Sequence, residues 1–165
     1  MLMKIFVTGV NGQLGYDVMN ELAKRGYEGI GSDLAPAYRG AADSAAAAMP
    51  YISLDITDKQ AVQDVISQVH PDAVIHCAAW TAVDLAEDDD KVAKVRDINA
   101  NGTQYIASAC KAVDCKMVYI STDYVFDGQG TTPWQPDCKD YKPLNVYGQT
   151  KLEGELAVAH TLEKY

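Results

Sequence analysis

Short apolar runs and longer helical patterns alternate along the chain. Short apolar runs bounded by glycine, proline or aspartate are typical of strands that are buried on both faces of a sheet. Apolar residues spaced three or four positions apart are typical of helices that pack against such a sheet. The runs predict five strands, over residues 4–8, 27–33, 51–55, 73–78 and 116–121.

Helical patterns separate or follow these runs. The second helix begins at a cap, Thr57 or Asp58, and extends to about Val69. The third follows the acidic stretch Glu87–Asp90 and reaches about Val113; carboxylates there suit the positive end of a helix dipole and favour a solvated cap over a cation site. The first helix covers residues 13–25, with an inner face of Leu14, Val18, Leu22 and Ala23, and the fourth covers residues 147–163.

The order of these elements predicts the fold class. Strands separated by helices pair in parallel through right-handed crossovers, which gives a doubly wound α/β sheet with helices on both faces, a Rossmann-like fold. Residues 34–50 are expected to form a loop with a short helical piece, and residues 122–143 form a second loop rich in Gly, Pro and Asp. Residues 1–165 contain no internal repeat or interdomain linker and are expected to form one domain.

A glycine-rich run directly follows the first strand and opens the first helix. Gly9, Gly12 and Gly15 form a GxxGxxG pattern, in which the glycines allow a tight turn, close approach of a pyrophosphate and close helix packing. Asp33 ends the second strand, where a carboxylate accepts hydrogen bonds from ribose hydroxyls and repels a 2′-phosphate. The pattern therefore predicts a dinucleotide site that favours NAD(H), with NADP(H) left open because Arg39 follows in the next loop.

A YxxxK pair provides candidate chemistry. Tyr147 and Lys151 lie one helical turn apart, so both side chains can reach one substrate. A phenol with a pKa near ~10 exchanges protons poorly at neutral pH, and a nearby ammonium group lowers that pKa. Thr122 follows the fifth strand at the edge where open α/β sheets place their ligands; a threonine that only caps a turn is the alternative.

Charge and cysteine content narrow the class of partner. The net charge of −9 argues against nucleic acid and anionic membranes as partners. The four cysteines form no CxxC pair and no cluster with histidine, which predicts reduced thiols and no metal site. The apolar run over residues 1–7 is too short for a signal peptide or a membrane span, so a cytoplasmic location is expected.

Together these motifs resemble the extended short-chain dehydrogenase/reductase family over essentially the whole chain. The resemblance implies that Thr122 hydrogen-bonds the reacting oxygen, Tyr147 protonates the developing alkoxide, and Lys151 lowers the pKa of the tyrosine and holds the nicotinamide ribose. Asp55 and Ile56 would contact adenine. The full cofactor-binding set implied is Gly9, Asn11, Gly12, Gln13, Leu14, Gly15, Asp33, Asp55, Ile56, Cys77, Ala78, Ala79, Thr81, Asn99, Tyr147 and Lys151.

Three segments resemble one branch of that family, the dTDP-4-dehydrorhamnose reductases. They are residues 79–87 (AWTAVDLAE), 121–128 (STDYVFDG) and 143–148 (PLNVYG). The resemblance implies reduction of the C4 ketone of dTDP-4-dehydro-L-rhamnose to dTDP-L-rhamnose for surface polysaccharide, with Asp123 and Tyr124 touching the sugar beside Thr122. The departures are His76-Cys77 for Asn-Ala and Leu85 for Lys, which put the details of cofactor contact in doubt.

Two other functions stay open. Dehydratases of the family carry Glu where this chain has Tyr124, so simple reduction fits better than dehydration or epimerisation. A non-catalytic subunit similar to the methionine adenosyltransferase β subunit is the other alternative. Members of the family are longer than 165 residues, so residues 1–165 are expected to be a C-terminally truncated NAD(P)-binding domain that lacks most of the substrate-binding part. The unpaired sheet edge would invite association such as a homodimer.

Overall fold

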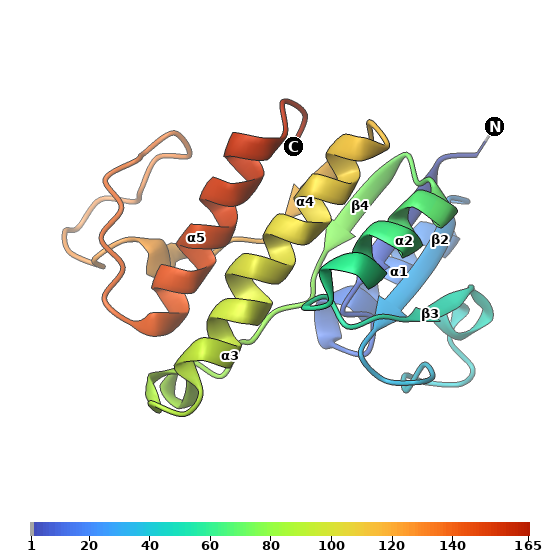
Figure 1. The fold of residues 1–165 in the computed structure, drawn as a ribbon, viewed down its shortest axis with the longest axis horizontal. Coiled ribbons are helices and arrows are strands. Elements are labelled where there is room, and N and C mark those ends of the chain that lie inside the picture. Colours follow the sequence, from blue (N-terminus) through green and yellow to red (C-terminus); the bar gives the residue numbers. More distant parts are fainter. Residues whose placement is uncertain (1) are drawn as a thin grey trace.

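A parallel sheet forms the centre of the molecule. The computed structural model describes residues 2–165, so Met1, the first residue of the predicted N-terminal run, lies outside the described part. Within that part the five strands are ordered β3-β2-β1-β4-β5, and every neighbouring pair is parallel (Figure 1). The strands are β1 (Lys4–Thr8), β2 (Glu28–Asp33), β3 (Tyr51–Ser53), β4 (Ala73–His76) and β5 (Lys116–Tyr119).

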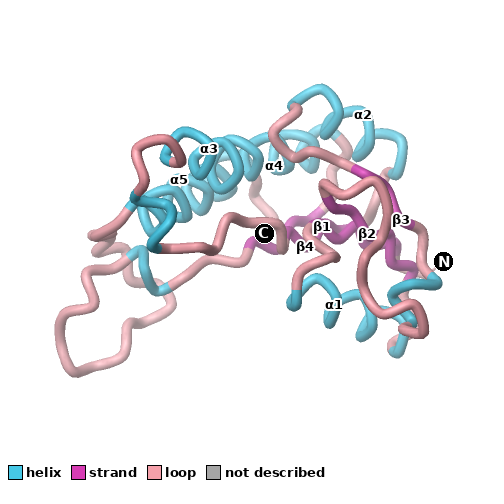
Figure 2. The backbone as a smooth tube through the Cα atoms, turned by 90° about the horizontal axis from the view of Figure 1, so that it is seen from below, coloured by secondary structure: helices cyan, strands magenta, loops and turns pink. Residues whose placement is uncertain are grey.

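Helices cover both faces of this sheet, which confirms the doubly wound α/β prediction. In Figure 2, α1 lies on one side of the sheet while α2, α4 and α5 lie on the other. A 3₁₀ turn at Ala45–Ala48 is the short helical piece expected in the loop after β2. The helices are α1 (Gln13–Lys24), α2 (Lys59–Val69), α3 (Val92–Arg96), α4 (Thr103–Ala112) and α5 (Val146–Thr161).

Each face of the sheet has its own apolar core. Phe6 of β1 packs with Ile66 of α2 and Ile106 of α4 on one face. Its neighbours in β1, Ile5 and Val7, point to the other face and pack against α1. Successive strand residues point to opposite faces, so a strand covered on both sides must be apolar throughout, as the short runs indicated.

Two predictions about helices were wrong. The helix expected to reach Val113 without a break is divided by a π-helical turn at Asp97–Gly102 between α3 and α4. On α1, Leu14 is 45 % exposed, whereas Gly15, Met19 and Leu22 form the buried face. Leu14, in the first turn of α1, lines the cavity at the carboxyl ends of the strands rather than the core.

The chain changes direction at β1, which determines where a ligand can bind. From β1 it proceeds outward to β2 and β3, and then returns across the sheet to β4 and β5 on the other side. The connections after β1 and after β4 therefore diverge at the carboxyl ends of these strands. In open α/β sheets, that crevice is where ligands bind.

Candidate active site

A cavity of about 770 Å³ opens at this crevice. It reaches from the glycine-rich turn after β1 to the start of α5. Most of the residues predicted to bind a cofactor line it, and they come from four separate strand ends and α5. They are Gly9, Gly12, Gln13, Leu14, Gly15, Asp33, Asp55, Ile56, Cys77, Ala78, Ala79, Thr81, Tyr147 and Lys151.

The glycines of the turn are required by close backbone contacts. Gly9 has φ +73°, and a Cβ there would lie 2.6 Å from the backbone nitrogen of Ala78. A Cβ on Gly15 would lie 2.3 Å from the carbonyl oxygen of Gly9. Gly12, the N-cap of α1, is exposed and provides no side-chain cap, so the first amides of the helix are open toward the cavity.

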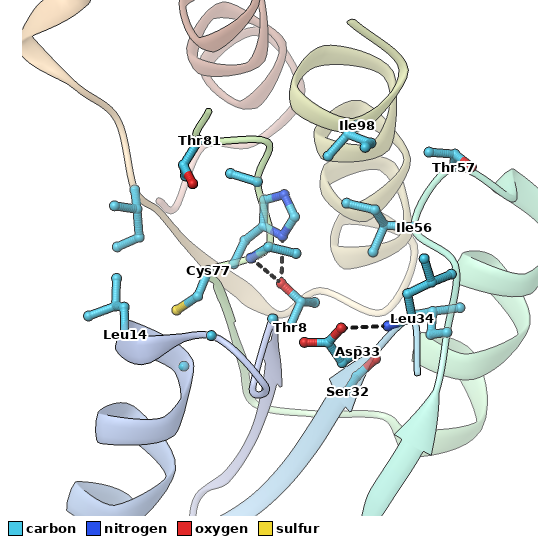
Figure 3. A pocket seen from close by; sticks show the side chains of 18 of the residues that line it. Thr8, Leu14, Ser32, Asp33, Leu34, Ile56, Thr57, Cys77, Thr81 and Ile98 are labelled. Atoms are coloured by element: carbon cyan, nitrogen blue, oxygen red, sulfur yellow. Dashed lines mark hydrogen bonds between the residues drawn. The ribbon is translucent and has the colours of Figure 1, made fainter. Parts of the chain in front are cut away.

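Asp33 braces the glycine-rich turn while facing the cavity. One carboxylate oxygen accepts a hydrogen bond from the backbone amide of Asn11 (3.0 Å), and the other accepts from that of Leu34 (2.8 Å; Figure 3). Asn11 itself lies outside the cavity lining, where its side-chain oxygen accepts from the amide of Arg39 (2.7 Å). Asn11 thus has a structural role in the turn, and its role toward a cofactor stays a prediction.

The next strand end provides an apolar wall. Ile56 is buried and lies beside Ile98 of the π-helical turn on the same side of the cavity (Figure 3). The carboxylate of Asp55 accepts hydrogen bonds from the amide (2.9 Å) and hydroxyl (2.7 Å) of Thr57, which holds this turn in shape. The two isoleucines form an apolar surface of the cavity, and the adenine contact predicted for Asp55 and Ile56 stays a prediction.

A chain of hydrogen bonds runs beneath the cavity through His76. The amide of Ala78 donates to Oγ1 of Thr8 (3.2 Å), which lies 2.7 Å from Nδ1 of His76 (Figure 3). On the other side of the ring, Nε2 lies 3.1 Å from Oγ1 of Thr103, which donates to the carbonyl of Asn99 (2.8 Å). Since Thr103 uses its proton on Asn99, the ring must donate from Nε2 and accept at Nδ1.

Burial keeps that imidazole neutral. His76 is 2 % exposed, and desolvation, aided by the nearby Lys151 charge, lowers its pKa to about 3. The adjacent thiol of Cys77 points into the cavity, and burial raises its pKa to about 11. Cys77 is therefore a thiol at neutral pH, and all four cysteines are free, as expected.

Tyr147 and Lys151 form the far wall of the cavity. The amine of Lys151 is almost fully buried, donates to the carbonyl of Ile120 (2.5 Å) and lies 4.2 Å from the centre of the Tyr119 ring. Desolvation lowers the pKa of Lys151 to about 8. The ring of Tyr147 packs edge-on against Tyr124, with centroids 5.5 Å apart.

Two side chains fix the start of α5 and hence the position of Tyr147. Oδ1 of Asn145 accepts from the amide of Gly148 (2.7 Å) as an N-cap, and Oε1 of Glu87 accepts from the amide of Val146 (2.6 Å). The acidic stretch was expected to cap the helix that follows it directly. Glu87 instead binds a helix 59 residues farther along the chain.

The segment after β5 differs from the expectation. The strand ends at Tyr119, so Thr122 lies beyond the strand rather than at its end, and Ser121 lines the cavity instead. Oγ1 of Thr122 caps a 3₁₀ turn by accepting from the amide of Tyr124 (3.2 Å). Thr122, Asp123 and Tyr124 all lie outside the cavity lining, and their roles toward a substrate stay predictions.

Asn99 also lies outside the cavity lining. Its side chain is fully buried, accepts from the amide of Trp80 (2.8 Å), and donates to the carbonyl of Trp80 (3.1 Å) and to Oγ1 of Thr150 (3.3 Å). The π-helical turn aims Asn99 at that backbone. Asn99 therefore supports the loop that carries Ala79 and Thr81, and it joins this loop to α5.

Sequence reasoning missed several lining residues. Those at strand ends could have been found from strand register, because carboxyl ends of parallel strands share one edge. Those on α3 and at the start of the π-helical turn left no signal, because the break between these two elements is not visible in the pattern. The first group is Thr8, Ser32, His76, Ile120 and Ser121, and the second is Lys94, Asp97 and Ile98.

Two further searches cover the part of the chain that the structure describes. No group of three or more His, Cys, Asp and Glu side chains among residues 2–165 is placed to hold a metal ion. No helix in the same range is long and apolar enough to cross a membrane.

Comparisons with known proteins give consistent results. The curated dTDP-4-dehydrorhamnose reductase of Streptomyces griseus is 38% identical over 156 residues, which are 94% of this chain and 45% of that protein. The crystal structure of such a reductase from Clostridium acetobutylicum has a TM-score of 0.83 at 38% identity, and the match covers 99% of this chain and 51% of that one. The crystal structure of a Bacillus anthracis reductase in complex with NADP has a TM-score of 0.79 at 34% identity. The match covers 100% of this chain and 52% of that one.

The chain thus spans about half the length of the relatives it matches. The family model described as the RmlD substrate binding domain matches residues 3–165. The chain belongs to that family.

Proposed function

We propose that the protein carrying this chain is an NAD(P)H-dependent oxidoreductase that reduces the C4 ketone of dTDP-4-dehydro-L-rhamnose to dTDP-L-rhamnose. The observation that carries the proposal is that one cavity joins the open amides of α1 to the side chains of Tyr147 and Lys151. A nucleotide cofactor and a reacting carbonyl would thereby share one cavity. Relatives named dTDP-4-dehydrorhamnose reductase, at 32–38% identity, support the choice of substrate.

The cavity fits a dinucleotide. A Cβ on Gly12 would meet the carbonyl oxygen of Gly9 at 3.3 Å and no other described atom within 4 Å, so the glycine leaves open space rather than relieving a clash. That space lies before amides that bind phosphate. The Asp33 carboxylate faces the expected position of the adenosine ribose and favours NADH over NADPH. NADPH stays open because the Bacillus anthracis relative binds NADP.

The side chains of the far wall would complete the reaction. A reduced nicotinamide, when bound, supplies hydride to the carbonyl carbon. Tyr147 gives its phenolic proton to the developing alkoxide, and the buried ammonium of Lys151 stabilises the phenolate that remains and holds ribose hydroxyls. Thr122 would donate its hydroxyl proton to the carbonyl oxygen once a substrate displaces the carboxylate of Asp123, to which that hydroxyl donates in this structure (3.3 Å). Tyr124 stands where a dehydratase would need an acid, which favours simple reduction.

We also propose a setting for this activity. The partner is a nucleotide sugar rather than nucleic acid, in keeping with the net charge of −9. The protein would act in the cytoplasm, where free thiols such as those of Cys110 and Cys115 persist. The edge strand β5 leaves one side unpaired in the described part, which suits association such as a homodimer.

A titration with NADH and NADPH tests the cofactor step. Gly12→Glu would place a carboxylate before the open amides, so we expect the affinity for either cofactor to fall at least about 100-fold, or roughly 2.7 kcal/mol. Gln68→Glu adds the same charge on an exposed position of α2 and should leave binding unchanged. Absence of binding to the folded chain would refute the dehydrogenase assignment. Turnover of the keto sugar by the protein carrying this chain then tests the substrate.

A further inference from the structure

One carboxylate joins three parts of the YxxxK end of the cavity. Glu155 lies on α5, one turn beyond Lys151. Its Oε2 accepts a hydrogen bond from Oγ of Ser121 (2.6 Å), a residue of the cavity wall. Its Oε1 accepts from the hydroxyl of Tyr141 (2.8 Å), which belongs to the long loop after β5. Both oxygens are thus engaged by residues from separate segments.

Through Tyr141, Glu155 anchors that loop. The ring of Tyr141 stacks on Phe126 (5.7 Å between centroids, 22° between planes), and Phe126 stacks on Trp134 (4.5 Å, 13°). The amide of Lys142 also donates to the carbonyl of Val125 (2.9 Å). The loop has no helix or strand between these residues, so the aromatic stack, the Glu155 contact and the contacts of Lys142 with Val125 and Asp127 together hold residues 126–142 in place.

The same carboxylate acts on Lys151. Desolvation lowers the pKa of Lys151, and the negative charge of Glu155 acts in the opposite direction. The hydrogen bond to Glu155 also raises the pKa of Tyr141 to about 12, so the tyrosine remains a donor over the working pH range. The other titratable groups near Lys151 are His76, Cys77, Tyr119 and Tyr147, and those near Glu155 and Tyr141 are Tyr119, Cys138 and Tyr165.

We propose that Glu155 is a positioning residue for the reductase: its carboxylate fixes Ser121 and the loop 126–142 against α5 and keeps Lys151 in its ammonium form. The inference rests on the proposed function, because it assigns Glu155 a task in that reaction. Glu155 lies outside the cavity lining, so it acts through Lys151, Ser121 and Tyr141 rather than on substrate.

The charge component is tested by the pH profile of kcat/KM in the whole protein carrying this chain. Glu155→Gln keeps the size of the side chain but removes its charge, so the alkaline limb should move to lower pH, with activity at pH 8 falling about threefold to tenfold and less at pH 6.5. Glu155→Asp keeps the charge and should keep the limb near that of the unaltered protein. Glu163→Gln, an exposed position just beyond α5, is the matched control. An unmoved limb in folded Glu155→Gln overturns the charge role.

The anchoring component is tested without turnover. Trypsin cleavage after the exposed Lys139, followed by mass spectrometry, should be about tenfold faster in Glu155→Ala than in Glu163→Gln, with melting temperatures measured in parallel to show that both are folded. Equal cleavage rates would overturn the anchoring role. If the unaltered protein binds cofactor but does not reduce the keto sugar, the proposed substrate fails. The pH dependence of NADH affinity then tests Glu155 by the same comparison.

Discussion

The two ends of the cavity are held in shape by different kinds of contact. At the glycine-rich end, backbone touches backbone: Gly9 approaches Ala78, and Gly15 approaches Gly9. At the YxxxK end, side chains bridge loops: Glu155 binds Ser121 and Tyr141, while the amine of Lys151 binds a carbonyl. Substitutions at the glycine-rich end should therefore disturb both folding and cofactor binding. Substitutions at the YxxxK end should disturb the reaction with little effect on the fold.

Lys151→Met should give the largest effect and separates chemistry from folding. Loss of the ammonium group beside Tyr147 should lower kcat by at least about 10²-fold, within the range for general acid catalysis. Met fills a similar volume and removes a buried charge, so the melting temperature should be maintained or rise. Keto-sugar turnover and thermal unfolding of the same sample check both parts. A loss of stability that matched the loss of activity would refute the contrast between the two ends.

Gly15→Ala should disturb both properties at the other end. The new Cβ would lie 2.3 Å from a backbone oxygen that cannot rotate away, so we expect a loss of about 3 kcal/mol in the free energy of unfolding together with weaker NADH binding. Denaturant unfolding and a cofactor titration measure the two effects. Gly26→Ala is the matched control: it has φ +73° and open space around its Cβ position, so its cost should be about 1 kcal/mol, with NADH affinity unchanged.

This difference explains which parts of the site could be predicted from sequence. A backbone contact that excludes a Cβ requires glycine, and three glycines at fixed spacing are visible in the sequence, as is the YxxxK pair on one helix face. The fold was predictable for the same reason, because β1 is apolar on both faces. Glu155 and Glu87 gave no such sign, since either could have been a solvated surface carboxylate; their partners come from loops whose paths no periodicity describes.

Strand ends were the weakest part of the prediction. The fifth apolar run continues through Ile120, yet pairing with β4 stops at Tyr119, and the chain then turns into the cap formed by Thr122. Asn99 shows a related limit. Its place in the chain matched the resemblance, but the π-helical turn directs its side chain to the backbone of Trp80 rather than into the cavity. Residue type and position identify a candidate, and local backbone geometry decides what it touches.

His76 lies between the two ends and offers the smallest but most specific test. Its pKa is about 3 in the fold, against an ordinary value of 6.5, so the unfolded chain takes up a proton near pH 6.5 while the folded chain does not. Stability is therefore lost as pH falls from 6.5 toward 3. At pH 5 the loss from this group should be about 2 kcal/mol, because one pH unit corresponds to about 1.4 kcal/mol.

His76→Asn should remove that part of the pH dependence. The variant gives up ring contacts with Thr8 and Thr103, so its stability at pH 7 should be about 1–3 kcal/mol lower. Its free energy of unfolding should then change less between pH 7 and pH 5 than that of the unaltered chain, by about 2 kcal/mol. Urea unfolding at both pH values measures the difference, and His160→Asn, at an exposed position, should retain the original slope. Parallel curves for His76→Asn and the unaltered chain would show that the imidazole titrates normally, and the directional chain from Ala78 to Asn99 would then need a different proton arrangement.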